Sequence, residues 1–427
     1  MFVGILPEQG PKLSIPLRFY ILGTTHIIIA LIFLIGFIYN LKPKELIFFN
    51  LFYNKTFLFY IHCFTVGYLL FIIFGSLFQI FPVVFGVKIQ KVKLVNASLI
   101  LVFYGILFFL YQIEIQFTYS LGIIYVVGYF ILLILLFFII PLLKRAGTNI
   151  GFLFAFFAFF SGLVVIQIYF LKLFDLIKLE ISFFKLGFFH SVFMFIGFVL
   201  QLIVSMFIVI LPLFYVSKPY PKKIKLFLNI FYFLVPFLFI IINLFYDNIF
   251  IFKILFFLSN LTFIYFTLKI LFSRERKIRD ITISFFYFAL LNFFVANILL
   301  FFDIFFFFAF LFFMIFIIAV IQGMLYKIVP FLCWFHLQSY KNQMRAQNPA
   351  FPLSLFTFTM QDFTYKKLEK IQFALLLVIS TIIPLMTFPS WILIVLVLVL
   401  FFFIFSLIQI LYALRKYIVT YKNFQII

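Results

Sequence analysis

The sequence GSLFQIFPVVF, Gly75–Phe85, ends a long apolar stretch, and the chain carries two looser copies of it. These are SMFIVILPLFY at Ser205–Tyr215 and GMLYKIVPFLC at Gly323–Cys333. Each copy has a small residue seven positions before a proline, and the first two also have a glycine fifteen positions before it, Gly67 and Gly197. Small residues let membrane helices approach closely, and such helices tolerate proline. The three copies therefore predict three related membrane helices.

The composition around these copies is that of an integral membrane protein. Of the 427 residues, 67% are hydrophobic and 10% charged, and the mean hydropathy is +1.32. Such values exceed those of soluble globular domains. The two cysteines, Cys63 and Cys333, lie far apart, which argues against a disulfide framework or a paired-cysteine metal site. The N-terminal residues lack a signal-peptide pattern, so we expect the first helix to remain in the mature protein.

The hydropathy predicts one membrane domain, 1–427, with twelve helices, each near the roughly 20 residues that a bilayer requires. We place them at approximately 18–40, 56–85, 94–113, 119–143, 149–171, 186–216, 225–246, 249–273, 281–302, 304–334, 369–388 and 390–414. With this count, most of the 32 Lys and Arg residues fall in the terminal segments and even-numbered loops. Basic residues are retained on the cytoplasmic side, so both termini are expected there. The basic residues are spread over short loops, which disfavours a nucleic-acid partner.

The three copies fall in helices 2, 6 and 10, which predicts a pseudo-threefold arrangement of four-helix units. The third copy differs, because Ile315 takes the place of the earlier glycine. Since Gly and Pro are common in membrane helices generally, the alternative is that the recurrence has no architectural meaning.

Four histidines are the candidate functional residues. His62 and His190 lie at matching depths, roughly 7 to 10 Å below the outer edge of the hydrocarbon. His26 and His336 belong to the inner half, where hydrogen bonding to a neighbouring helix is the favoured role. Intramembrane histidines often mark a ligand or proton site.

Two imidazoles at one depth suit either a six-coordinate haem or part of a copper site. Met194 follows His190 by one helical turn, and its thioether could ligate copper or serve as an axial ligand, although packing is the usual role of such a methionine. We therefore expect His62, His190 and Met194 as metal ligands, with haem b or copper as the cofactor. Tyr326 is expected as an interfacial aromatic, and Lys327 as a lysine that reaches the headgroups.

Three blocks carry a resemblance to a known family. They are HCFTVGYLLFIIFGSLFQIFPVV from His62, HSVFMFIGFVLQLIVSMFIVILPLF from His190 with the tail KPYP, and GMLYKIVPFLCWFHLQ from Gly323. With twelve helices, they resemble the catalytic subunit of haem-copper oxidases and NnrS-type haem- and copper-containing membrane proteins. The resemblance implies a bacterial inner-membrane protein in respiratory electron transfer or nitric oxide and gas handling, which works with a partner subunit.

The chain also departs from that family. The oxidases take further ligands from helices 7 and 10, whereas residues 224–246 contain no histidine and the outer half of helix 10 reads IFFFFAFLFF. A complete binuclear oxygen-reducing centre is therefore not expected.

Two other classes stay open, and the sequence does not establish whether the chain is an enzyme. Twelve helices with both ends inside also suit a secondary transporter, although charged residues are almost absent from the helix interiors. A cofactor-free structural subunit of a respiratory complex is the third class. The loop at 337–368 is expected to lie on the cytoplasmic membrane surface.

Overall fold

The computed structural model describes residues 11–40, 60–85, 150–245, 250–275, 277, 280–302, 306–347 and 357–425. In these residues the protein is all-helical, without a strand, and ten helices are long and apolar enough to cross a membrane. The expected helices at 94–113 and 119–143 lie outside the described residues, so the count of twelve stays a prediction. The described part defines the class: a multi-pass helical membrane protein.

The elements that position the candidate residues fall into three groups. The α-helices are α1 (Ser14–Tyr39), α4 (Leu70–Phe85), α7 (Ile150–Leu173), α8 (Phe183–Val192), α9 (Gln201–Tyr215), α10 (Lys222–Phe245), α11 (Phe250–Phe272), α12 (Ile281–Phe301), α13 (Phe306–Gln347), α14 (Lys366–Ile382) and α15 (Pro389–Gln425). Two π-helical segments are η2 (Cys63–Leu69) and η3 (Phe193–Leu200). Two 3₁₀ segments are η5 (Met360–Phe363) and η6 (Ile383–Thr387).

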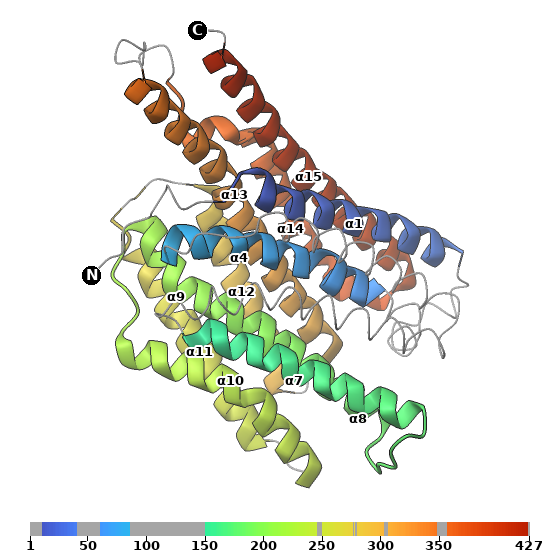
Figure 1. The fold of residues 1–427 in the computed structure, drawn as a ribbon. Coiled ribbons are helices and arrows are strands. Elements are labelled where there is room, and N and C mark those ends of the chain that lie inside the picture. Colours follow the sequence, from blue (N-terminus) through green and yellow to red (C-terminus); the bar gives the residue numbers. More distant parts are fainter. Residues whose placement is uncertain are drawn as a thin grey trace. The chain divides into compact units, whose positions relative to one another are not determined.

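The chain forms two compact units, 1–146 with 321–427, and 147–320. In the first unit, α1 packs along η2 and α4 on one side and along α15 on another, and α14 packs on α15 (Figure 1). The α1 interface is close, because a Cβ on Gly75 would lie 2.8 Å from both Phe19 Cβ and Tyr20 Cε1.

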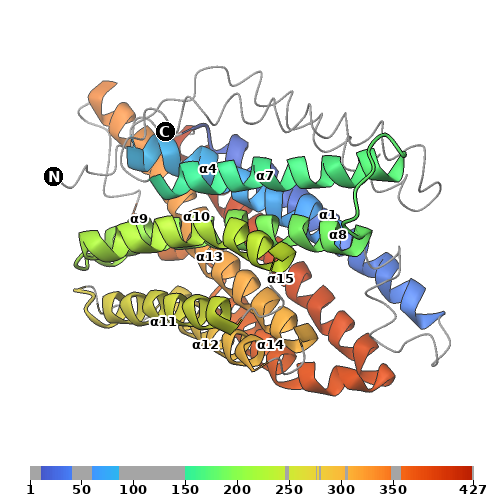
Figure 2. The ribbon, with the colours of Figure 1, turned by 90° about the horizontal axis from the view of Figure 1, so that it is seen from below.

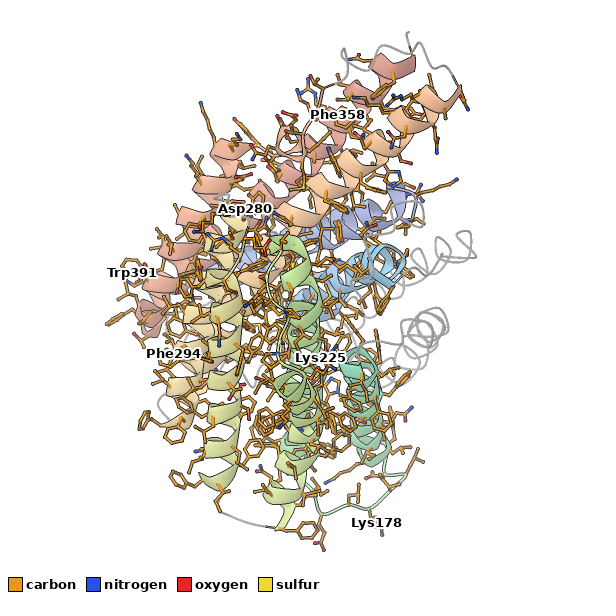
Figure 3. All side chains as sticks on the ribbon, turned by 90° about the vertical axis from the view of Figure 1, so that its left-hand side faces the viewer. Lys178, Lys225, Asp280, Phe294, Phe358 and Trp391 are labelled. Carbon is orange, nitrogen blue, oxygen red and sulfur yellow. The ribbon has the colours of Figure 1, made fainter. Side chains whose placement is uncertain are left out.

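In the second unit, α7 packs along the continuous helix formed by α8, η3 and α9, and α10 covers both. The helices α11 and α12 lie side by side, and α11 also contacts α9 (Figure 2). Lys178 and Asp280 mark opposite ends of this unit (Figure 3). The first two copies of the recurring sequence thus each lie in a helix that packs along the described helix preceding it.

The prolines of all three copies, Pro82, Pro212 and Pro330, lie inside helices. Apolar packing keeps such helices continuous despite the backbone hydrogen bond that proline removes. After Pro212 the helix α9 ends with Val216 in the left-handed conformation, at φ 49°. Its carbonyl accepts a hydrogen bond from the Glu275 N–H, at 3.2 Å, which ties the end of α9 to the segment after α11.

Two helices extend well beyond the expected ends. The helix α13 continues to Gln347 rather than giving way to a surface loop at 337, and α15 continues to Gln425 rather than ending near 414. Neither extension contains a Gly or Pro, and both are rich in residues that favour helix. The helix ends are set by these propensities, whereas hydropathy reports only the apolar span.

Tyr220, from the KPYP tail, lies outside the membrane-spanning helices and is buried. Its hydroxyl donates to Thr267 Oγ1 at 2.8 Å, because the Thr267 hydroxyl is itself the donor to the Phe263 carbonyl. Burial raises the pKa of Tyr220 well above its ordinary value, so the hydroxyl stays protonated and keeps this hydrogen bond.

Candidate functional site

His190 lies in the last turn of α8, directly before the π-helical segment η3. Its Nδ1 donates to the Gly162 carbonyl of α7 at 2.9 Å, because a carbonyl oxygen can only accept. This bond places the proton on Nδ1, so Nε2 carries the lone pair. Histidines that bind metals characteristically donate their other ring N–H in this way.

Met194 lies on the same face as His190, against the same glycine. A Cβ on Gly162 would lie 2.9 Å from Met194 Cε and 3.5 Å from its sulfur. The structure therefore brings two of the three predicted ligands to one position on α7. Packing against Gly162 accounts for the thioether equally well, so Met194 as a ligand stays a prediction.

His62 lies in the other unit, half-buried, and directly precedes the π-helical segment η2. The described helix begins at Tyr60, so the imidazole lies within the first turn. Because His62 and His190 belong to different units, their pairing stays a prediction.

The two histidine-bearing helices share a structural feature that the third copy lacks. Each turns π-helical just after its histidine, and each π-helical segment contains the glycine of the recurring pattern, Gly67 or Gly197. In α13, where Ile315 replaces that glycine, the helix is α-helical throughout. Single-turn π segments are rare and occur frequently at functional sites.

Both glycines allow close approach of the preceding described helix. Gly67 lies against the His26 ring of α1. Gly197 lies against α7 and α10, where an added Cβ would be 2.7 Å from Ala158 Cβ and 2.9 Å from Pro236 Cγ. His26 and Ala158 thus occupy corresponding positions of two similar helix pairs.

The two inner histidines differ in their hydrogen bonding. His336 Nε2 donates to the Pro11 carbonyl at 2.9 Å, which confirms a hydrogen-bonding role, although its partner is the N-terminal segment rather than a helix. His26 is 7% exposed, and its Nε2 has no hydrogen-bond partner among the described residues. The expected bond to a neighbouring helix is therefore not made by that nitrogen.

A buried polar cluster holds three helices of the second unit together. Gln201 Nε2 lies 3.4 Å from the Gly151 carbonyl, 3.4 Å from Ser205 Oγ and 3.3 Å from Asn229 Oδ1. Gln201, Ser205 and Asn229 are all 0% exposed. Long bonds from one amide to three acceptors hold α7, α9 and α10 loosely, since typical N–H···O distances are shorter.

A second chain of polar groups links α10, α11 and α12. The Tyr232 hydroxyl donates to Asn260 Oδ1 at 2.6 Å, and Asn260 Nδ2 donates to Asn297 Oδ1. All three side chains are buried. Buried amides of this kind are satisfied within the protein because lipid offers no partner.

The first unit contains its own polar cluster. Gln372 accepts from Gln322 and from the Tyr326 hydroxyl, and Ser406 donates to Gln322 Oε1 at 2.8 Å. Tyr326 is 4% exposed, so its expected interfacial position was wrong. The hydroxyl instead lies inside the bundle because a glutamine of α14 accepts its proton.

Among the described residues, no group of three or more His, Cys, Asp or Glu side chains is arranged to hold a metal ion. A site built from His190 with Met194 or with a second histidine has fewer such residues. Searches with protein-family models, against curated proteins and against solved structures find no match to this chain. The fold and the histidine environments therefore carry the functional argument.

Proposed function

We propose that this protein binds haem b or copper in the membrane through His62 and His190, and serves respiratory electron transfer or nitric oxide and gas handling. The observation that carries the proposal is the His190 bond to the Gly162 carbonyl, because it prepares Nε2 as a ligand. The matching π-helical segments after the two histidines support a shared role. The pairing of the two imidazoles rests on their equal depth in the sequence.

The residues present fit a low-coordinate or bis-histidine centre. Two neutral imidazoles would hold a haem iron, and the Met194 thioether would favour reduced copper. When bound, such a group supplies one-electron transfer. The chain's own contribution is to fix the His190 tautomer and to surround the centre with apolar side chains that exclude water.

The absence of histidines from residues 224–246 argues for an electron carrier or gas-binding protein rather than an oxygen-reducing enzyme. The bacterial inner membrane, with both termini cytoplasmic, is the location that the basic-residue distribution supports. An oxidase-like twelve-helix architecture with pseudo-threefold symmetry completes the proposal.

Haem and copper analysis of the purified protein tests this function. We expect a b-type haemochrome spectrum or bound copper, lost in both His62→Ala and His190→Ala. His336→Ala is the matched control, since its imidazole donates to Pro11, and it should keep the cofactor. A folded protein without haem or copper, or one in which either histidine variant keeps full occupancy, would refute the proposal.

A secondary transporter is the second candidate, and the buried amides of the second unit favour it. Uncharged polar side chains such as Gln201 and Asn260 lie inside a bundle that is otherwise apolar. Transporters place polar groups inside their helix bundles to bind solutes and ions. A metal-free protein whose unfolding temperature rises with a particular solute would support this candidate over a structural subunit.

A further inference from the structure

The pair of helices α14 and α15 shows where the membrane surface lies on the first unit. The two helices are packed together, and Tyr365 before α14 stacks on Tyr412 of α15, with ring centroids 5.4 Å apart. The Tyr365 N–H also donates to Gln409 Oε1 at 3.1 Å. Trp391 lies toward the opposite end of α15 from Phe358 (Figure 3).

The span from Pro389 to Tyr412 is about 35 Å long at 1.5 Å per residue, close to the roughly 30 Å of a bilayer core. Tyrosine and tryptophan prefer the two membrane interfaces. The Tyr365–Tyr412 stack therefore marks one interface, and α15 continues beyond it to Gln425.

Five exposed basic side chains surround this stack, and we call them the collar. They lie within about one and a half helical turns of the two tyrosines: Lys366, Lys367, Lys370, Arg415 and Lys416. Among the described residues none of the five forms an ion pair or a side-chain hydrogen bond. The nearby Asp362 is engaged by the backbone and hydroxyl of Thr359, at 2.6 and 3.0 Å.

We propose that the collar binds the phosphate headgroups of anionic phospholipids. Clusters of four or more Lys and Arg at the end of a membrane helix attract anionic lipids. Arginine also binds phosphate through two parallel hydrogen bonds. The collar lies at the depth of the headgroups, which makes a lipid the occupant that fits it, rather than a soluble acidic protein.

The structure supplies a matched control further along the same helices. Tyr340 of α13 packs on Tyr421 and Phe424 of α15, with ring centroids 4.9 and 5.7 Å apart. Beside these rings lies a second basic group, which we call the tip: Lys341, Arg345 and Lys422. Lys422 is about 15 Å beyond Tyr412, farther than the Debye length of about 8 Å at physiological salt.

The test compares the two groups in nanodiscs of phosphatidylcholine, with and without phosphatidylglycerol. Unfolding is followed by a maleimide dye that reports exposure of Cys63 and Cys333, both of which are buried. The collar variant is Lys366→Gln, Lys367→Gln and Arg415→Gln, and the tip variant is Lys341→Gln, Lys422→Gln and Arg345→Gln. Each removes two lysines and one arginine.

We expect phosphatidylglycerol to raise the unfolding temperature of the unchanged protein and of the tip variant equally, and to leave the collar variant unchanged. Lys366→Arg with Lys367→Arg should keep the effect, because the charge is retained. Loss of the effect in the tip variant, its persistence in the collar variant, or no stabilisation of the unchanged protein would overturn the proposal. So would equal stabilisation by inorganic phosphate in phosphatidylcholine alone, which would indicate a soluble anion.

Discussion

At the scale of single residues, Val216 carries the clearest backbone strain. It adopts φ 49° at the end of α9, a region that costs a side-chain-bearing residue roughly 1–2 kcal/mol. Its side chain is 41% exposed, so little packing depends on it. We expect Val216→Gly to raise the free energy of unfolding by about 0.5–1 kcal/mol, after the greater chain entropy of glycine is subtracted.

Chemical denaturation in detergent checks this prediction, with Val216→Ala as its control. Alanine keeps a Cβ and therefore most of the strain, so its stability should change little. The hydrogen bond from the Glu275 N–H to the Val216 carbonyl persists in both variants because it involves only the backbone. A glycine variant less stable than the alanine variant would show that the left-handed conformation is not strained.

The candidate ligands could be chosen from the sequence, but not their surroundings. His190 and Met194 were found from their residue types and their spacing on one helix. The Gly162 carbonyl that fixes the His190 tautomer lies 28 residues earlier in the chain, and no sequence signal pairs them. The Tyr326 bond to Gln372 was missed for the same reason, since its partner comes from α14.

At the scale of helices, the glycines of the recurring pattern have a testable packing role. Gly197 has no room for a Cβ between Ala158 and Pro236, whereas a Cβ on Gly187, earlier in the same helix, would meet no atom within 4 Å. We expect Gly197→Ala to lower the free energy of unfolding by about 1–3 kcal/mol through overpacking. Gly187→Ala should instead raise it by up to about 1 kcal/mol, because alanine favours helix.

Denaturation of the two variants side by side measures this difference. Since both substitutions are Gly→Ala in one helix, helix propensity alone would move both in the same direction. A stabilised Gly197→Ala would mean that α7 and α10 shift apart without cost. The π-helical segment would then not depend on close packing.

Apolar length predicted the membrane helices well where they end near the bilayer surface. The range 149–171 became Ile150–Leu173, and 225–246 became Lys222–Phe245. The same criterion failed for α13 and α15, whose polar ends stay helical. The π-helical segments also escaped prediction, because their formation depends on neighbouring helices as well as on Gly67 and Gly197.

At the scale of the whole molecule, the membrane topology rests on residues 94–143, where two of the twelve helices are expected. Helices on both sides of this stretch are described, so its crossing number fixes the side of its loops rather than the parity of the rest. If both helices cross, the segment around Glu114 lies opposite to Lys91 and Arg145. If neither crosses, all three lie on one side.

Single cysteines at Lys91, Glu114 and Lys178 test this with a membrane-impermeant maleimide applied to intact spheroplasts. The native Cys63 and Cys333 are buried and should give little background. Twelve helices with cytoplasmic termini predict labelling of Glu114→Cys and Lys178→Cys from outside, and of Lys91→Cys only after the membrane is opened. Protection of Glu114→Cys together with Lys91→Cys would reduce the count to ten. Because basic residues are retained inside, the unlabelled Lys91 would in either case identify the cytoplasmic face.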